Sequence, residues 1–208
     1  MSLSKVIEVP EVEREVSNVI GQMLHLCQGY RQSEMRFLSD EINLPTFARL
    51  FELIRILETR YIEEIIRFQI SRGQKVTWQD IKPVENLEAS KPVQMLQIIL
   101  DLEKSVHQST INLCKLGWKN LDLALTSFLE NRVILKQIKV IRKRANQLRD
   151  LKRSGDEICP MLTSRLSVRF EVEKLEERVE LEIERREWRS GESRSRKRFP
   201  IIGSMNRF

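Results

Sequence analysis

The chain has 208 residues, of which 32% are charged and only 7 are glycine and 6 proline, and its formal net charge is +6. This length suffices for one domain with a sizeable core, and the scarcity of Gly and Pro favours long helices over a turn-rich β fold. We find no signal-peptide pattern and no membrane-spanning apolar stretch. Three scattered cysteines indicate free thiols in a reducing compartment. We therefore expect a cytoplasmic protein, with the nucleus as an alternative, and no membrane partner.

A first amphipathic helix is predicted from about Glu11 to Leu38. Its apolar residues recur at intervals of three and four, which places them on one helical face. This face consists of Val16, Ile20, Met23, Cys27 and Tyr30. Tyr30 is either a core aromatic residue with a satisfied hydroxyl group or a residue beside a functional site.

The stretch from Pro45 to Ser71 predicts a second long helix. One face consists of Phe47, Phe51, Ile54, Glu58, Tyr61, Ile65 and Phe68. Glu58 interrupts this face at its middle, and burying an unpaired carboxylate there would cost several kcal/mol. A metal, a shared proton or a partner on another helix must therefore compensate its charge.

Residues 74–90 have little helical periodicity, and we interpret them as a long crossover loop, which allows the flanking helices to run parallel. Two more helices follow, from about Pro92 to Leu116 and from about Leu121 to Lys152. Their predicted inward faces are Leu96, Ile99, Glu103, Val106, Thr110 and Leu113, and then Glu130, Ile134, Gln137, Ile141, Ala145 and Leu148. Glu103 and Gln137 interrupt these two faces near their middles.

Four long helices with one long crossover predict an all-α four-helix bundle, which we place at residues 1–154. The polar groups of Glu58, Glu103 and Gln137 would meet at a similar height inside it. Two carboxylates and a carboxamide provide the hard oxygen ligands that iron, manganese or magnesium take. In the alternative without a metal, the two carboxylates share a proton or a water, and one of them has a strongly raised pKa.

Residues 155–208 are predicted to form a charged C-terminal extension. From Ser164 to Ser190, apolar residues at spacings of four and three indicate an amphipathic helix or a short coiled coil. These apolar residues are Val168, Val172, Leu175 and Val179. The last segment, 191–208, is polar and basic and is predicted to be disordered.

Two basic runs, Lys136 to Arg153 and Arg185 to Arg198, are candidate contacts for the phosphates of nucleic acid. For the first run we favour a solvated helix end, where the helix dipole stabilises cations. The second run contains RSRKR, a nuclear-localisation pattern that is common by chance. The chain has no phosphate-binding loop and no obvious nucleophile–base pair, which argues against hydrolase or transferase chemistry.

Several segments resemble animal ferritin heavy chains. They are NLPTFARLF at the start of the second helix, RGQKVTWQDIKP in the crossover, LEKSVHQS in the third helix and NQLRDL in the fourth. The similarity is collinear from about Val16 to Lys152, whereas the part after Gly155 has no clear counterpart. The resemblance implies a ferritin-like four-helix bundle and an iron-storage or iron-binding subunit.

In heavy-chain ferritins a di-iron centre inside the bundle oxidises Fe(II) with O₂. The resemblance matches two of its metal ligands to Glu58 and Glu103, but Met23 and Tyr61 stand where a glutamate and a histidine are expected. A thioether is a soft ligand for iron, and a phenol titrates near ~10 unless a metal binds it. We therefore expect a weak iron site, a degenerate ferroxidase centre and lost or weakened ferroxidase activity, and we assign no catalytic residue.

The resemblance also places residues around this centre. Tyr30 matches a tyrosine beside the site, Gln137 matches a glutamine of the fourth helix, and Tyr61 lies next to the metal ligands. An active ferroxidase would need Tyr61 or His107 to replace the lost ligands. Whether the chain is an enzyme is therefore left open by the sequence.

Outside the bundle centre, the resemblance marks two further regions. The three-fold pore positions read Ser127 and Glu130, so an iron-entry pore would keep half of its acidic charge. The positions of the inner-surface carboxylates that promote mineral growth read Leu57, Arg60 and Glu63. Only Glu63 is acidic, and we expect poor nucleation of ferric mineral.

The resemblance implies a homo-oligomer or a hetero-oligomer with other ferritin chains. The family's fifth helix packs around the four-fold axis of a 24-subunit shell, and a longer charged extension replaces it here. Charged side chains are hard to bury in such a pore, so we expect either that this shell does not form or that the extension points outward. The alternative function is a ferritin-derived binding module that uses basic surfaces for nucleic acid or protein partners.

Overall fold

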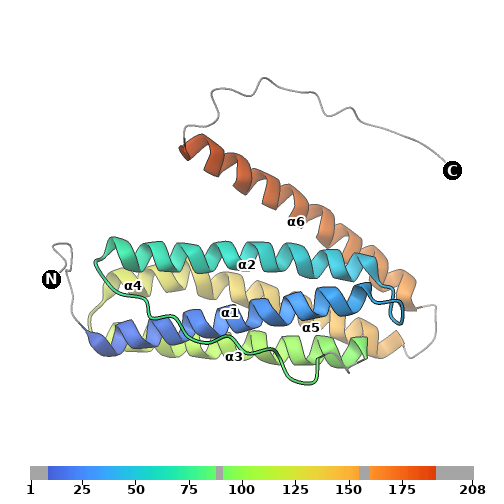
Figure 1. The fold of residues 1–208 in the computed structure, drawn as a ribbon, viewed down its shortest axis with the longest axis horizontal. Helices are drawn as coiled ribbons and strands as arrows, with labels where there is room; N and C mark the ends of the chain where they lie inside the picture. The colour runs from blue at the N-terminus through green and yellow to red at the C-terminus, as the bar shows by residue number, and fades with distance from the viewer. Residues whose placement is uncertain (1–8, 88–90, 155–159, 191–208) are drawn as a thin grey trace.

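The computed structural model describes residues 9–87, 91–154 and 160–190, and this part of the chain is helical and contains no strand (Figure 1). The elements are α1 (Pro10–Leu38), α2 (Pro45–Ser71), α3 (Pro92–Lys119), α4 (Leu123–Phe128), the π-helical segment η1 (Leu129–Ile134), α5 (Leu135–Ser154) and α6 (Pro160–Ser190). None of the helices within these ranges is long and apolar enough to cross a bilayer.

Four helical rods form the bundle, with α4, η1 and α5 together making the fourth (Figure 1). The helices α1 and α2 are antiparallel, and residues 72–87 then run back along the bundle, so that α3 is parallel to α2. A proline in the first turn begins each of the first three helices, and Gly73, with φ of 72°, follows the end of α2. The predicted four-helix bundle with one long crossover is confirmed.

The core is built from the inward faces of α1, α2 and α3. Every residue predicted on the inward faces of α1 and α3 is buried. Of the five aliphatic and phenylalanine positions predicted on the inward face of α2, Phe68 is partly buried and the other four are buried: Phe47, Phe51, Ile54 and Ile65. Aromatic rings join α1 to α2, because Phe37 stacks between Phe47 and Phe51 at centroid distances of 5.4 and 5.5 Å. This cluster fixes the register of α1 against α2 on one side of the bundle centre.

The fourth rod differs from the single uniform helix that the sequence predicts. Its first part is wound as the π-helical segment η1, in which each turn holds more residues than an α-helical turn. A count of α-helical turns back from Gln137 therefore predicts that Glu130 faces the core. In the structure Glu130 is exposed, and Leu129 and Val133 are buried instead. The prediction that Glu130 lies on the inward face is wrong for this reason.

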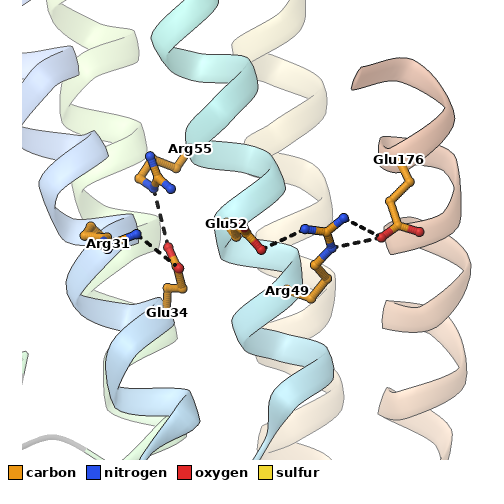
Figure 2. Close-up of polar contacts among 6 residues, drawn as sticks. All are labelled: Arg31, Glu34, Arg49, Glu52, Arg55 and Glu176. Carbon is orange, nitrogen blue, oxygen red and sulfur yellow. Dashed lines mark hydrogen bonds and ion pairs between the residues drawn. The ribbon is translucent and has the colours of Figure 1, made fainter. Parts of the chain in front are cut away.

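The helix α6 packs against α2 and α5 of its own bundle. Its predicted apolar residues are the buried ones, Val168, Val172, Leu175 and Val179. Arg49 of α2 forms an ion pair with Glu176 of α6 at 2.8 Å while it also pairs with Glu52 (Figure 2). Residues 164–190 were predicted to form an amphipathic helix or a short coiled coil, and the structure has the amphipathic helix. The segment 191–208, predicted to be disordered, lies outside the described residues.

The docking of α6 can be measured with two substitutions in that helix. Leu175→Ala removes a side chain that is 8% exposed and should lower the free energy of unfolding by about 2 kcal/mol. Leu181→Ala, at a side chain that is 53% exposed, is the matched control and should change it by less than about 0.5 kcal/mol. Urea unfolding measures both. Equal effects of the two substitutions would show that α6 does not pack on the bundle.

Candidate metal centre

A small cavity of about 30 Å³ lies inside the bundle, which is about the space that one water molecule occupies. All four rods contribute to its lining. The lining includes Met23 and Tyr30 of α1, Glu58 and Tyr61 of α2, Glu103 of α3, and Lys136 and Gln137 of α5. The structure thus brings the five predicted site residues and Met23 together, and it adds the cations of Arg132 and Lys136.

Glu103 is buried and forms an ion pair with a buried arginine. The Nε of Arg144 lies 3.2 Å from the Oε1 of Glu103, and the two side chains are 1% and 3% exposed. The hydroxyl of Tyr30 donates a hydrogen bond of 2.9 Å to the same oxygen. The Arg144 guanidinium also donates to Gln147 and lies over the ring of Phe51, 5.0 Å from its centroid. One carboxylate oxygen of the expected metal site is therefore already occupied.

The other oxygen of Glu103, Oε2, is buried and has no hydrogen-bond partner among the described residues. Burial raises the pKa of the Glu103 carboxyl group, and the charge of Arg144 and the hydrogen bond from Tyr30 oppose that rise. An unpaired buried oxygen is costly, so a proton or one water in the cavity would satisfy it.

Glu58 is partly buried and lies opposite Glu103 in the cavity lining. Burial and then the charge of Glu103 raise the pKa of Glu58 from 4.5 to about 7, while the charge of Lys136 opposes the rise. Lys136 is itself half-buried, and its Nζ lies 3.5 Å from the centroid of the Tyr61 ring. Burial lowers the pKa of Lys136. Glu58 is thus near half-protonation at neutral pH.

The two residues that replace expected ligands offer no suitable donor. Met23 is 1% exposed and presents a thioether. Burial raises the pKa of Tyr61 to about 12, so its phenol is protonated at neutral pH, and Arg178 of α6 donates a hydrogen bond to its hydroxyl oxygen. A protonated phenol that is already hydrogen-bonded is a poor ligand for Fe(II).

His107 does not supply the missing imidazole. Its Nδ1 lies 3.0 Å from the Oε1 of Gln137, and the Nε2 of Gln137 donates to the hydroxyl of Thr110 at 3.1 Å. Because this amide orientation leaves its oxygen as the acceptor, the Nδ1 of His107 carries the proton. His107 does not line the cavity, so it does not replace either of the metal ligands that an active centre would need.

The residues of this centre do not fit a di-iron site. In the described ranges, no three His, Cys, Asp or Glu side chains gather closely enough to hold a metal ion. Arg144 pairs with Glu103 and the charge of Lys136 acts on Glu58, so each carboxyl group has a cation nearby without a metal. A metal ion at Glu58 and Glu103 stays a prediction, and this arrangement of cations opposes it.

Sequence reasoning missed Arg144 because it lies within the basic run that we interpreted as a solvated helix end. That interpretation is wrong for Arg144, which is 1% exposed, and incomplete for Lys136, which is half-buried. A signal was present, because Arg144 follows Gln137 by seven residues, which is two helical turns along the same face.

The other predicted residues lie away from the cavity. Glu130 is exposed on η1 and accepts a hydrogen bond of 3.3 Å from the indole of Trp118. Leu57 is 4% exposed, Arg60 donates to a backbone carbonyl of α6, and Glu63 is partly buried on α2. The face of α2 that the resemblance relates to mineral growth is therefore covered in part by α6.

Comparisons with known proteins agree with this architecture. Residues 11–154 match the model of the Ferritin-like domain family. The chain is 30% identical over 145 residues to "Soma ferritin" of Lymnaea stagnalis, covering 70% of this chain and 83% of that protein. It is 28% identical over 141 residues to "Ferritin, middle subunit" of Salmo salar (68% and 80% covered) and 28% identical over 145 residues to "Ferritin heavy chain" of Echinococcus granulosus (70% and 84% covered).

Removing Arg144 tests the buried ion pair. Arg144→Met should lower the free energy of unfolding by about 3–5 kcal/mol, because it leaves Glu103 buried without its cation. The double variant Arg144→Met with Glu103→Gln should recover part of that loss. Arg142→Met, an exposed position on the same helix, is the control and should have little effect. Additive losses at 144 and 103 in urea unfolding would contradict a coupled pair.

The raised pKa of Glu58 predicts a pH-dependent stability. The folded pKa of about 7 exceeds the ordinary value of 4.5, so the folded state binds this proton more tightly than the unfolded chain. Ionisation of Glu58 therefore lowers stability as the pH rises from about 4.5 to about 7. Glu58→Gln should stabilise the protein more at about pH 8 than at about pH 4.5 in unfolding experiments with chelator present. An identical difference at both pH values would refute it.

Proposed function

The chain belongs to the ferritin family, and from this membership we propose that it is an iron-storage subunit whose own bundle centre oxidises Fe(II) poorly or not at all. The observation that carries the proposal is the ion pair between Arg144 and Glu103. The assembly then stores iron as its cargo, whereas the bundle centre of this subunit stabilises the fold and does not oxidise Fe(II).

Electrostatics supports the loss of ferroxidase activity. An Fe(II) ion entering the cavity would lie close to the cations of Arg144 and Lys136, and buried like charges repel strongly where the effective dielectric constant is low. The side chains of Arg144 and Lys136 would both have to move away before Glu58 and Glu103 could bind one metal ion together. Arg144 is held by Gln147 and Phe51 as well as by Glu103, so its departure would break three interactions.

The position of α6 supports weak mineral nucleation on this subunit. Arg60 contacts Glu182 and the backbone of α6, and Leu57 lies beneath that helix in the lining it shares with Leu175. Glu63 is then the one acidic group among the three nucleation positions. A subunit of this kind would contribute to storage in an assembly with other ferritin chains, which supply oxidation and nucleation, or in a homo-oligomer that takes up iron slowly.

The alternative of a module that binds nucleic acid receives less support. Burial removes Arg144 from the surface of the first basic run, and Lys143 pairs with Glu171 of α6 at 3.2 Å. The RSRKR motif of the second run lies outside the described residues. Cytoplasmic localisation stays a prediction of the sequence.

Iron oxidation in air tests the proposal. The purified protein should oxidise Fe(II) no faster than the buffer blank, and Glu58→Gln should leave that rate unchanged. A variant with Arg144→Leu, Lys136→Leu, Met23→Glu and Tyr61→His, which removes both cations and restores the expected ligands, should oxidise Fe(II) faster than the wild type. Fast wild-type oxidation that Glu58→Gln abolishes would overturn the proposal.

Assembly is measured on the same samples by light scattering, with the protein alone and after co-expression with a catalytically competent ferritin chain. We expect an oligomer that contains both chains. A monomer under both conditions would refute the proposal that the chain is a storage subunit. It would not contradict the ion pair between Arg144 and Glu103 at the bundle centre.

A further inference from the structure

A second and larger concavity lies where α6 diverges from the bundle. In Figure 1 the N-terminal part of α6 lies near α2, and its C-terminal part moves away from it. The wedge between them contains a cleft of about 700 Å³, which we call the basic cleft. Its basic residues are Arg60 and Arg67 of α2, Arg132 of η1, Lys136 of α5, and Arg178 and Arg185 of α6.

The charges of the basic cleft are not balanced by its own acids. Six basic side chains face two carboxylates, Glu64 and Glu182. Glu182 is already shared, because it lies 3.3 Å from the guanidinium of Arg60 and 3.5 Å from that of Arg178. In the described part of the chain, Arg67, Arg132 and Arg185 have no hydrogen-bond or ion-pair partner.

The three unpaired guanidinium groups come from three different elements. Arg67 lies on α2, Arg132 on η1 and Arg185 on α6, and all three line the same cleft. Packing between the elements therefore brings these like charges together, which is unfavourable for the protein alone. Burial lowers the pKa of the adjacent Lys136; the charges of Glu64 and Glu182 oppose this shift, and those of Arg178 and Arg132 add to it. An anion in the cleft would relieve the repulsion.

We propose that the basic cleft binds a small ligand with several phosphate groups, such as a linear polyphosphate chain. Guanidinium groups bind phosphate through paired N–H donors, and three of them on separate walls can hold more than one phosphate group. The cleft volume of about 700 Å³ lies within the range of small-molecule sites. A three-walled cleft favours a small ligand over a nucleic-acid duplex, whose phosphates lie on a broad convex surface.

Binding of such a ligand would also fix α6. Arg185 belongs to the diverging part of α6, whereas Arg67 and Arg132 belong to the bundle. A polyanion that contacts all three would bridge the helix and the bundle and stabilise the folded state by mass action. Anion binding at the basic cleft requires no iron chemistry, although Arg132 and Lys136 line both this cleft and the cavity at the bundle centre.

Calorimetric titration with inorganic tripolyphosphate tests the proposal. We expect the wild-type protein to bind one tripolyphosphate per chain with heat that saturates, and its melting temperature to rise with ligand concentration. Replacing Arg67, Arg132 and Arg185 together with glutamine should weaken binding by at least about tenfold. All three side chains are exposed and glutamine is a good helix former, so the variant should fold, and circular dichroism checks this.

A second triple variant controls for net charge. Arg142→Gln, Arg149→Gln and Arg153→Gln remove the same charge from exposed positions of α5 outside the cleft, and should weaken binding less than about threefold. Equal weakening by both triple variants would overturn the proposal, because it would show diffuse attraction to the whole basic surface. Absence of saturable binding by the wild type, or displacement of tripolyphosphate by an equal phosphate concentration of duplex DNA, would overturn it as well.

Discussion

The ion pair between Arg144 and Glu103 is the interaction on which the structure of the bundle centre depends. Removing two charges from water is costly, and the structure offsets this cost with a hydrogen bond from Tyr30, a hydrogen bond to Gln147 and the ring of Phe51. These contacts link α1, α2, α3 and α5 at one point. The four-helix architecture of the family is kept, and the protein's own cation Arg144 pairs with one carboxylate of the expected metal site.

The centre and the C-terminal helix are connected through Tyr61. Its ring lies beneath Lys136, its hydroxyl accepts a hydrogen bond from Arg178 of α6, and it borders the cavity with Glu58. The residue that replaces an expected imidazole thus serves as a contact for α6. Tyr61 thus takes part both in the lining of the bundle centre and in the docking of α6.

The sequence predicted the bundle, and helical periodicity placed Glu58, Glu103 and Gln137 at a similar height, where the structure has them lining one cavity. It did not predict the π-helical segment, since a uniform count of residues per turn cannot reveal a local change in winding. It also missed Arg144, because basic residues in a charged run are ordinarily solvated. The sequence could not predict that α6 packs on α2 and α5, because an apolar stripe indicates that a helix face is buried but not which element covers it.

The helix α6 has a geometric consequence for any closed assembly. The positions on α2 that the family resemblance relates to the inner surface lie beneath or beside this helix. If copies assemble with that face inward, each contributes a helix of 31 residues to the enclosed space. The volume left for mineral then falls with the number of such subunits in the shell. In a mixed assembly the ratio of subunits would therefore set how much iron one particle can hold.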